Sequence, residues 1–186
     1  MRIGIDLDGV VYDGESFDRD YIVPVLREGE IFHPQEFHLE KRFLNAPRSL
    51  VQGAFAKNED IYLTDYNYLK DYRILSNNVY VATARCNSHD AWSDKMDIVQ
   101  RTVSDMKALG IENVYFYHDK VQAYKELNLD AMIEDNPHHF MDLIQAGCNA
   151  FLVDCEYNRY IQTDRRLKSV FEYFDMFGVK YEKVCR

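Results

Sequence analysis

The sequence has no long uninterrupted hydrophobic run. No stretch approaches the roughly 18 consecutive apolar residues that a membrane-spanning helix needs. A secretory signal peptide is not expected either, because the carboxylates of Asp6 and Asp8 follow the short apolar start almost at once. We therefore expect a protein with no membrane partner.

Cysteine and positive charge are both scarce. The four cysteines form no Cys-x-x-Cys pair, so we expect ordinary thiols that fill the core of a protein in the reducing cytoplasm. The net charge is -9. Such a charge argues against a broad nucleic-acid or anionic-membrane footprint, so nucleic-acid binding is not expected.

What the sequence does contain is an alternation of β-rich and helical segments. After the apolar run before Asp6, strands are predicted at 78–82, 114–117, 131–133 and 150–153. Between and after them, helices are predicted at 90–109, 120–127, 137–147 and 167–178. The alternation predicts right-handed βαβ crossovers and a parallel sheet with helices on both faces.

A separate lobe is predicted between the first two strands. The chain length of 186 residues suits one α/β domain, over 1–16 and 73–186, with a small inserted helical lobe over 17–72. Pro47 is expected at the first position of a helix that ends at Ala56. The aromatic residues of the lobe are expected to form its own core, with one or two at most touching a substrate: Phe17, Tyr21, Phe32, Phe37, Phe43 and Phe55.

The most informative local pattern is the pair Asp6 and Asp8, followed by Gly9. Alternate residues of a strand point to the same face, so the two carboxylates are expected side by side where the first strand ends. Gly9 lets the backbone turn away sharply. Because adjacent carboxylates repel each other, this pair indicates a metal ion, a shared proton or a cationic partner.

Polar side chains also mark the ends of the other predicted strands. Thr83 ends the second strand, Lys120 follows the third, and Glu134 and Asp135 end the fourth. In parallel sheets, ligands bind beyond the carboxyl ends of the strands. We therefore expect these side chains to converge with the first carboxylate pair.

These segments, in this order, resemble the motifs of the haloacid dehalogenase superfamily. The matching segments are Asp6-Leu7-Asp8-Gly9-Val10, Val81-Ala82-Thr83-Ala84-Arg85, Lys120 and Ile133-Glu134-Asp135-Asn136-Pro137. The layout, with the segment 154–159, is similar to the 5'(3')-deoxyribonucleotidases and related nucleotidases, although the animal enzymes carry Thr-Ser-Pro in the second motif. The resemblance implies a Rossmann-like three-layer sandwich. Its parallel sheet has the order 5-4-1-2-3, with the strands numbered along the chain, and the insert is a helical cap.

The resemblance also implies roles for the residues at the strand ends. Asp6 is the nucleophile that forms an aspartyl-phosphate, and Asp8 is the general acid and base. Thr83 donates a hydroxyl to a phosphate oxygen, and Lys120 supplies a positive charge beside Asp6. Arg85 is expected to bind the substrate, at its phosphate or at its far end.

A magnesium site completes the implied chemistry. Mg²⁺ prefers oxygen ligands, and the expected ones are Asp6, the backbone carbonyl of Asp8 and Asp135. The implied function is a Mg²⁺-dependent phosphomonoester hydrolase, most simply a 5'-nucleotidase that acts on (deoxy)nucleoside monophosphates. Two alternatives stay open: a phosphatase of another small phosphoester, such as a sugar phosphate or a nucleic-acid end, and a non-catalytic regulatory protein on the same scaffold.

Other charged residues have plainer interpretations. Lys125 competes with Lys120 but lies farther from the strand end. His138 and His139 are adjacent and do not share a helix face, so they are expected at the surface rather than as a joint metal site. Three further acidic residues are expected to form a solvated stretch: Asp13, Asp18 and Asp20.

Overall fold

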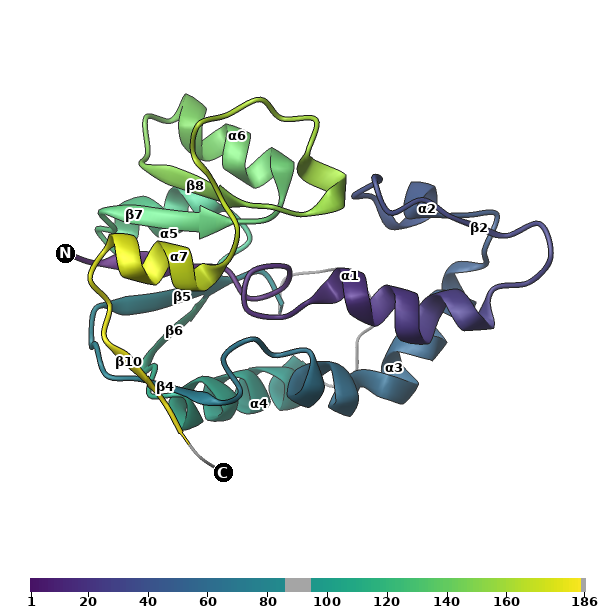
Figure 1. Ribbon diagram of the computed structural model, residues 1–186, viewed down its shortest axis with the longest axis horizontal. Helices are drawn as coiled ribbons and strands as arrows, with labels where there is room; N and C mark the ends of the chain where they lie inside the picture. The colour runs from purple at the N-terminus through teal and green to yellow at the C-terminus, as the bar shows by residue number, and fades with distance from the viewer. Residues whose placement is uncertain (86–94, 185–186) are drawn as a thin grey trace.

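The computed structural model describes residues 1–85 and 95–184, and its centre is a parallel α/β sheet (Figure 1). The strand order is β6-β5-β1-β7-β8-β9, and every neighbouring pair is parallel. The predicted order of the first five strands is confirmed, and β9 adds a sixth strand at the edge. The strands are β1 (Ile3–Ile5), β5 (Val79–Thr83), β6 (Asn113–Phe116), β7 (Ala131–Glu134), β8 (Ala150–Val153) and β9 (Arg166–Leu167).

Helices cover both faces of this sheet, as a Rossmann-like fold requires. Because side chains alternate along a strand, Met132 and Ile133 of β7 enter two different hydrophobic clusters. Met132 packs in the cluster that contains Phe140, and Ile133 in the one that contains Phe174. The first cluster belongs to α5 (Lys120–Glu126) and α6 (Pro137–Gln145), and the second to α4 (Lys95–Ala108) and α7 (Val170–Met176).

Most predicted boundaries differ from the structure by a residue or two. Leu167, predicted at the start of the last helix, lies in β9 instead. The helix begins later because the Ser169 hydroxyl caps it by accepting from the Glu172 N–H. The predicted start of the helix at residue 90 lies outside the described residues.

The insert contains two elements that sequence did not predict. β2 (Ile31–Phe32) and β3 (Phe43–Leu44) form an antiparallel hairpin within a segment predicted as helical. The chain enters the insert through α1 (Gly14–Phe17), which begins before residue 17. The remaining elements of the insert are a π-turn (Asp18–Ile22), a 3-10 turn (Val23–Val25), α2 (Leu39–Arg42) and α3 (Arg48–Asp65). In Figure 1, α1, α2 and α3 lie together to the right of the sheet, beyond the end toward which the β7 arrow points.

The long helix of the insert corrects a prediction. The predicted helix ends at Ala56, whereas α3 continues to Asp65, and Pro47 precedes its first residue rather than occupying it. The polar residues 57–60 suggest a helix end, but the helix continues through them to the buried side chains of Tyr62 and Leu63. The Asn58 amide supports this turn by donating to the Ala54 carbonyl at 2.8 Å.

A two-stranded sheet lies on the side of the fold away from the insert (Figure 1). β4 (Tyr72–Ile74) pairs antiparallel with β10 (Tyr181–Lys183), a pairing that sequence did not predict. Gly110 ends α4 against β4, with φ +85°. A Cβ at Gly110 would lie 2.3 Å from the Ile74 carbonyl oxygen, so the backbones approach too closely for a side chain. Within residues 1–85 and 95–184, no helix combines the length and the apolar character needed to cross a bilayer.

We expect Gly110→Ala to destabilise the fold strongly. The variant combines a left-handed backbone with a backbone clash, which together should lower the free energy of unfolding by about 3 kcal/mol. Gly147→Ala is the matched control, because Gly147 also ends a helix with φ +76° but has open space around it. Its loss should be only about 1 kcal/mol. Urea unfolding of both variants measures the difference, and equal losses would contradict this account of Gly110.

Candidate active site

A buried ammonium group joins three strand ends. The Lys120 Nζ donates to Asp6 Oδ1 at 2.8 Å, after β1, and to the Ala82 carbonyl at 2.6 Å, in β5. It also lies 3.0 Å from Glu134 Oε1, at the end of β7. Lys120 is only 2% exposed and opens α5, where the Asp119 side chain caps the helix. The surrounding carboxylates outweigh its burial and raise the pKa of Lys120.

Three carboxylates gather around this lysine. Asp6, Glu134 and Asp135 each offer an oxygen within 4.8 Å of the others, and all three are buried. Burial, opposed by Lys120 and reinforced by Glu134, raises the pKa of Asp6 to about 6. Burial, together with the charges of Asp6 and Glu134, raises the pKa of Asp135 well above its ordinary value. One ammonium group does not neutralise three carboxylates, so this all-oxygen donor set fits a hard divalent cation such as Mg²⁺.

The turn after β1 leaves room for the Asp135 carboxylate. Gly9 has φ +80°, and a Cβ there would lie 2.2 Å from Asp135 Oδ2. The Gly9 N–H donates to the Tyr12 carbonyl at 2.9 Å, which closes the turn. Gly9 is therefore required both by its backbone conformation and by contact with a carboxylate of the cluster.

The segment after β8 holds Asp135 from the other side. The Tyr157 hydroxyl donates to Asp135 Oδ2, and the buried Asn158 amide donates to the Asp135 and Val153 carbonyls at 2.8 Å each. The guanidinium of Arg42, from α2 of the insert, stacks on the Tyr157 ring at 5.1 Å. Tyr157 therefore contacts both the carboxylate cluster and the insert.

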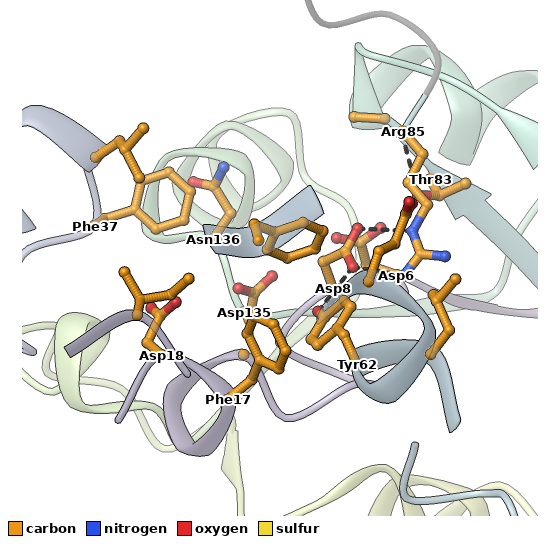
Figure 2. Close-up of a pocket in the computed structure, with 18 of the residues that line it drawn as sticks. Asp6, Asp8, Phe17, Asp18, Phe37, Tyr62, Thr83, Arg85, Asp135 and Asn136 are labelled. Atoms are coloured by element: carbon orange, nitrogen blue, oxygen red, sulfur yellow. Dashed lines mark hydrogen bonds and ion pairs between the residues drawn. The ribbon is translucent and has the colours of Figure 1, made fainter. Parts of the chain in front are cut away.

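Asp8 is held by other partners than Lys120. Arg85 donates to it through Nε at 2.9 Å and through Nη2 at 2.6 Å, and the Tyr62 hydroxyl donates at 2.9 Å (Figure 2). Desolvation would raise the pKa of Asp8, but the charge and hydrogen bonds of Arg85 and the bond from Tyr62 outweigh it and lower the pKa. The Arg85 guanidinium also stacks on the Tyr12 ring at 4.5 Å. Asp8 is thus an ionised group in this arrangement.

A cavity of about 470 Å³ connects these groups with the insert. This volume lies within the range of small-ligand sites. Three of the aromatic residues predicted in the insert, Phe17, Phe37 and Phe55, line the cavity together with Tyr62, and the other predicted aromatic residues pack elsewhere. Figure 2 shows Phe17 and Phe37 on the side of the cavity away from Asp6. The cavity therefore has a charged floor and a largely apolar wall.

The structure brings the predicted site residues together. Five of the predicted residues line the cavity: Asp6, Asp8, Thr83, Arg85 and Asp135. Lys120 is bonded to Asp6 but is buried beneath the cavity lining. Thr83 ends β5, is only 1% exposed, and its hydroxyl accepts a long bond of 3.4 Å from the Arg85 N–H. Lys125, the competitor of Lys120, is exposed.

Two interpretations of plain surface groups are wrong. Asp18 is not part of a solvated stretch: its carboxylate lies 2.8 Å from Arg42 Nε, and the pair lines the cavity. His138 is exposed as expected, but His139 is half-buried and its Nδ1 lies 3.7 Å from Glu134 Oε2. Burial lowers the pKa of His139, but the nearby Glu134 carboxylate outweighs burial and raises the pKa.

Sequence reasoning missed the tyrosines of the site. Tyr62 lies in the part of α3 beyond the predicted helix end, so no periodic pattern pointed to it. A helix that continues past Ala56 places Phe55 and Tyr62, seven residues apart, on one face, which is the signal that could have found Tyr62. Tyr157 lies in a segment without regular periodicity, and no local signal marks its contact with Asp135.

Comparisons with known proteins give distant matches. No family model matches the chain. A protein named nucleotidase from Clostridium acetobutylicum is 24% identical over 172 residues, which cover 86% of this chain and 83% of that protein.

Two solved structures align over nearly their whole length. D,D-heptose 1.7-bisphosphate phosphatase from B. bronchiseptica, crystallised with magnesium and phosphate, aligns over 95% of this chain and 98% of its own, with 12% identity and a TM-score of 0.45. The beta-phosphoglucomutase of Clostridium difficile aligns over 94% of this chain and 95% of its own, with 15% identity and a TM-score of 0.48.

We expect Lys120→Met to destabilise the protein severely. The substitution keeps the apolar stem but leaves the buried carboxylates of Asp6 and Glu134 without their cation, at a loss of about 3–5 kcal/mol. Lys125→Met is the control, because Lys125 lies exposed on the same helix, and its effect should stay within about 0.5 kcal/mol. Urea unfolding without divalent metal compares the two. A Lys120→Met variant as stable as the control would show that the cluster does not need this charge.

The half-buried Asp18 predicts a dependence of the stability of the protein on pH. Burial, opposed by Arg42, raises the pKa of Asp18 to about 6. A carboxyl group with a raised folded pKa stabilises the protein fully below its unfolded pKa, and this contribution is lost as the pH rises through the folded pKa. Relative to Asp18→Asn, the wild type should therefore lose roughly 2 kcal/mol of unfolding free energy between about pH 4 and pH 7. Urea unfolding across this range measures the difference, and parallel pH curves would refute the shift.

Proposed function

We propose that this protein is a Mg²⁺-dependent phosphomonoester hydrolase that forms an aspartyl-phosphate on Asp6. The observation that carries the proposal is the buried Lys120 ammonium, bonded to Asp6 in a cluster with Glu134 and Asp135 beneath a ligand-sized cavity. Idle carboxylates are expensive to bury, and a charged floor of this kind suits a phosphate dianion and its counter-ion.

The proposed reaction consists of two successive displacements at phosphorus, the first to Asp6 and the second from Asp6 to water. First, Asp8 takes up a proton from water. An Asp6 oxygen then bonds to phosphorus, the bond from phosphorus to the leaving oxygen breaks, and Asp8 gives this proton to the leaving oxygen. Second, a water oxygen bonds to phosphorus, Asp8 takes a proton from this water, and the bond between phosphorus and Asp6 breaks. Inorganic phosphate is released, and both carboxyl groups return to the states they had at the start of the first displacement.

The remaining groups neutralise and orient the phosphoryl group. Asp6, the Asp8 main-chain carbonyl and Asp135 would hold Mg²⁺, which neutralises the charge shared by the nucleophile and the phosphate when it is bound. Lys120 holds Asp6 in place and adds positive charge. Thr83, buried at the end of β5, offers its hydroxyl to a phosphate oxygen.

We further propose that the substrate is a (deoxy)nucleoside monophosphate. The supporting observations are the rings of Phe17, Phe37 and Phe55 on the cavity wall and the relative named nucleotidase. Flat bases pack well on such rings. In this proposal residues 17–72 act as a cap that covers the leaving group, and 1–16 with 73–186 form the catalytic core of a cytoplasmic enzyme.

Asp6→Asn tests the chemistry directly. This variant should lower kcat by roughly a thousandfold or more, and it should keep the fold, because it removes one of three mutually repelling carboxylates. Asp142→Asn, on the exposed side of α6, should leave kcat unchanged.

Two experiments on the wild type test the metal and the substrate. EDTA should abolish turnover and added Mg²⁺ should restore it. A panel of nucleoside monophosphates, sugar phosphates and phosphorylated oligonucleotides, measured by phosphate release, identifies the substrate class. Retained turnover in Asp6→Asn refutes the mechanism, and a preference for sugar phosphates refutes the nucleotide assignment.

A further inference from the structure

Asp8 is held by two side chains from different parts of the fold. Arg85, just after β5, binds both Asp8 oxygens, through Nη2 to Oδ1 at 2.6 Å and through Nε to Oδ2 at 2.9 Å. Tyr62, from α3 of the insert, donates to Oδ1 at 2.9 Å. Figure 2 shows the three bonds meeting at the Asp8 carboxylate.

This arrangement conflicts with the role proposed for Asp8. An acid that protonates the leaving oxygen must turn one of its own oxygens toward that atom. In the structure a bidentate arginine, which is among the strongest partners of a carboxylate, occupies both oxygens. At least one of the two partners must therefore release Asp8 before the reaction.

Of the two partners of Asp8, Arg85 is the one that could bind another group instead. Its planar fork matches phosphate as well as carboxylate, and it lies on the cavity wall near Thr83. Tyr62 has no such freedom, because its ring packs against Tyr12, Phe17 and Phe55 at centroid distances of 5.4, 5.0 and 5.2 Å. Its hydroxyl therefore stays where Asp8 is.

We propose that Tyr62 is a positioning residue that orients Asp8 during the reaction, and that Arg85 exchanges Asp8 for the phosphoryl group of the substrate. The proposal rests on the proposed function. Because Tyr62 belongs to the insert, Asp8 is oriented only while α3 lies over the core. The insert thereby takes part in proton transfer as well as in covering the leaving group.

Tyr62→Phe tests this role, because it removes the hydroxyl and keeps the packed ring. The informative comparison is between two esters, p-nitrophenyl phosphate and the nucleoside monophosphate that the wild type hydrolyses fastest. Nitrophenolate leaves without a proton, whereas a ribose oxygen needs one. For the nucleotide, kcat/KM, which covers the steps up to departure of the leaving oxygen, should fall about tenfold or more, and for the nitrophenyl ester it should change less than about twofold. The ratio of the two rates is independent of the folded fraction, so a loss of stability does not obscure the result.

Tyr66→Phe is the matched control. The Tyr66 ring also meets Phe17 edge-on, at 5.4 Å, but its hydroxyl donates to the Asp20 carboxylate at 2.5 Å, outside the cavity. Both rates should remain at the wild-type level in this variant. A change in the ratio here would mean that any lost tyrosine hydroxyl in α3 or at its end has the same effect, which would overturn the proposal.

Two further variants assign the effect to Asp8 and Arg85. Adding Tyr62→Phe to Asp8→Asn should cause no further fall in the nucleotide rate, because the hydroxyl acts through Asp8. Arg85→Gln should raise KM for both esters roughly tenfold without changing the ratio of their kcat/KM values. A changed ratio in Arg85→Gln with an unchanged ratio in Tyr62→Phe would reverse the two roles.

The failure of this proposal and the failure of the proposed function give different results. If the wild type hydrolyses neither ester, both are refuted. If the wild type hydrolyses both esters and Tyr62→Phe leaves the ratio unchanged, only this proposal is refuted.

Discussion

The site depends on one buried positive charge. Lys120 bonds to Asp6 and to the Ala82 carbonyl and lies 3.0 Å from Glu134, so a single ammonium group connects β1, β5 and β7 at their carboxyl ends. Each buried carboxylate carries a desolvation penalty of several kcal/mol, which only a close cation offsets. Since three carboxylates share one lysine, the cluster remains negative, and this residual charge is what a divalent cation would neutralise.

The insert is connected to the site by side chains rather than by regular structure. Tyr62 of α3 donates to Asp8, and Arg42 of α2 stacks on Tyr157, whose hydroxyl donates to Asp135. In the first contact, the ring of Tyr62 is held by aromatic packing. In the second, Arg42 is held by its ion pair with Asp18. The position of the insert therefore determines which hydrogen bonds the carboxylates have, in addition to the shape of the cavity.

The five long strands of the sheet could be predicted because each is a short apolar run that ends in a polar residue or a turn. The two-residue strands β2, β3 and β9 are too short to show a period of two, so no pattern distinguishes them from loops. The end of α3 was misplaced for a different reason. The run at 57–60 is polar because that turn is partly exposed, and helix packing on either side overrides the local signal.

The sequence by itself determined where the chemical groups stand along the chain: carboxylates, a hydroxyl and an ammonium group at the ends of successive strands. Parallel pairing then brings those ends to one edge, so their convergence follows from local pattern and topology. Only the tertiary structure decided their partners. Tyr62 and Asp8 are 54 positions apart, and Lys120 and Asp6 are 114 apart. No local period encodes such contacts, because they arise where the insert and the helices pack against the sheet, and that packing sets the charge and hydrogen bonding of each group.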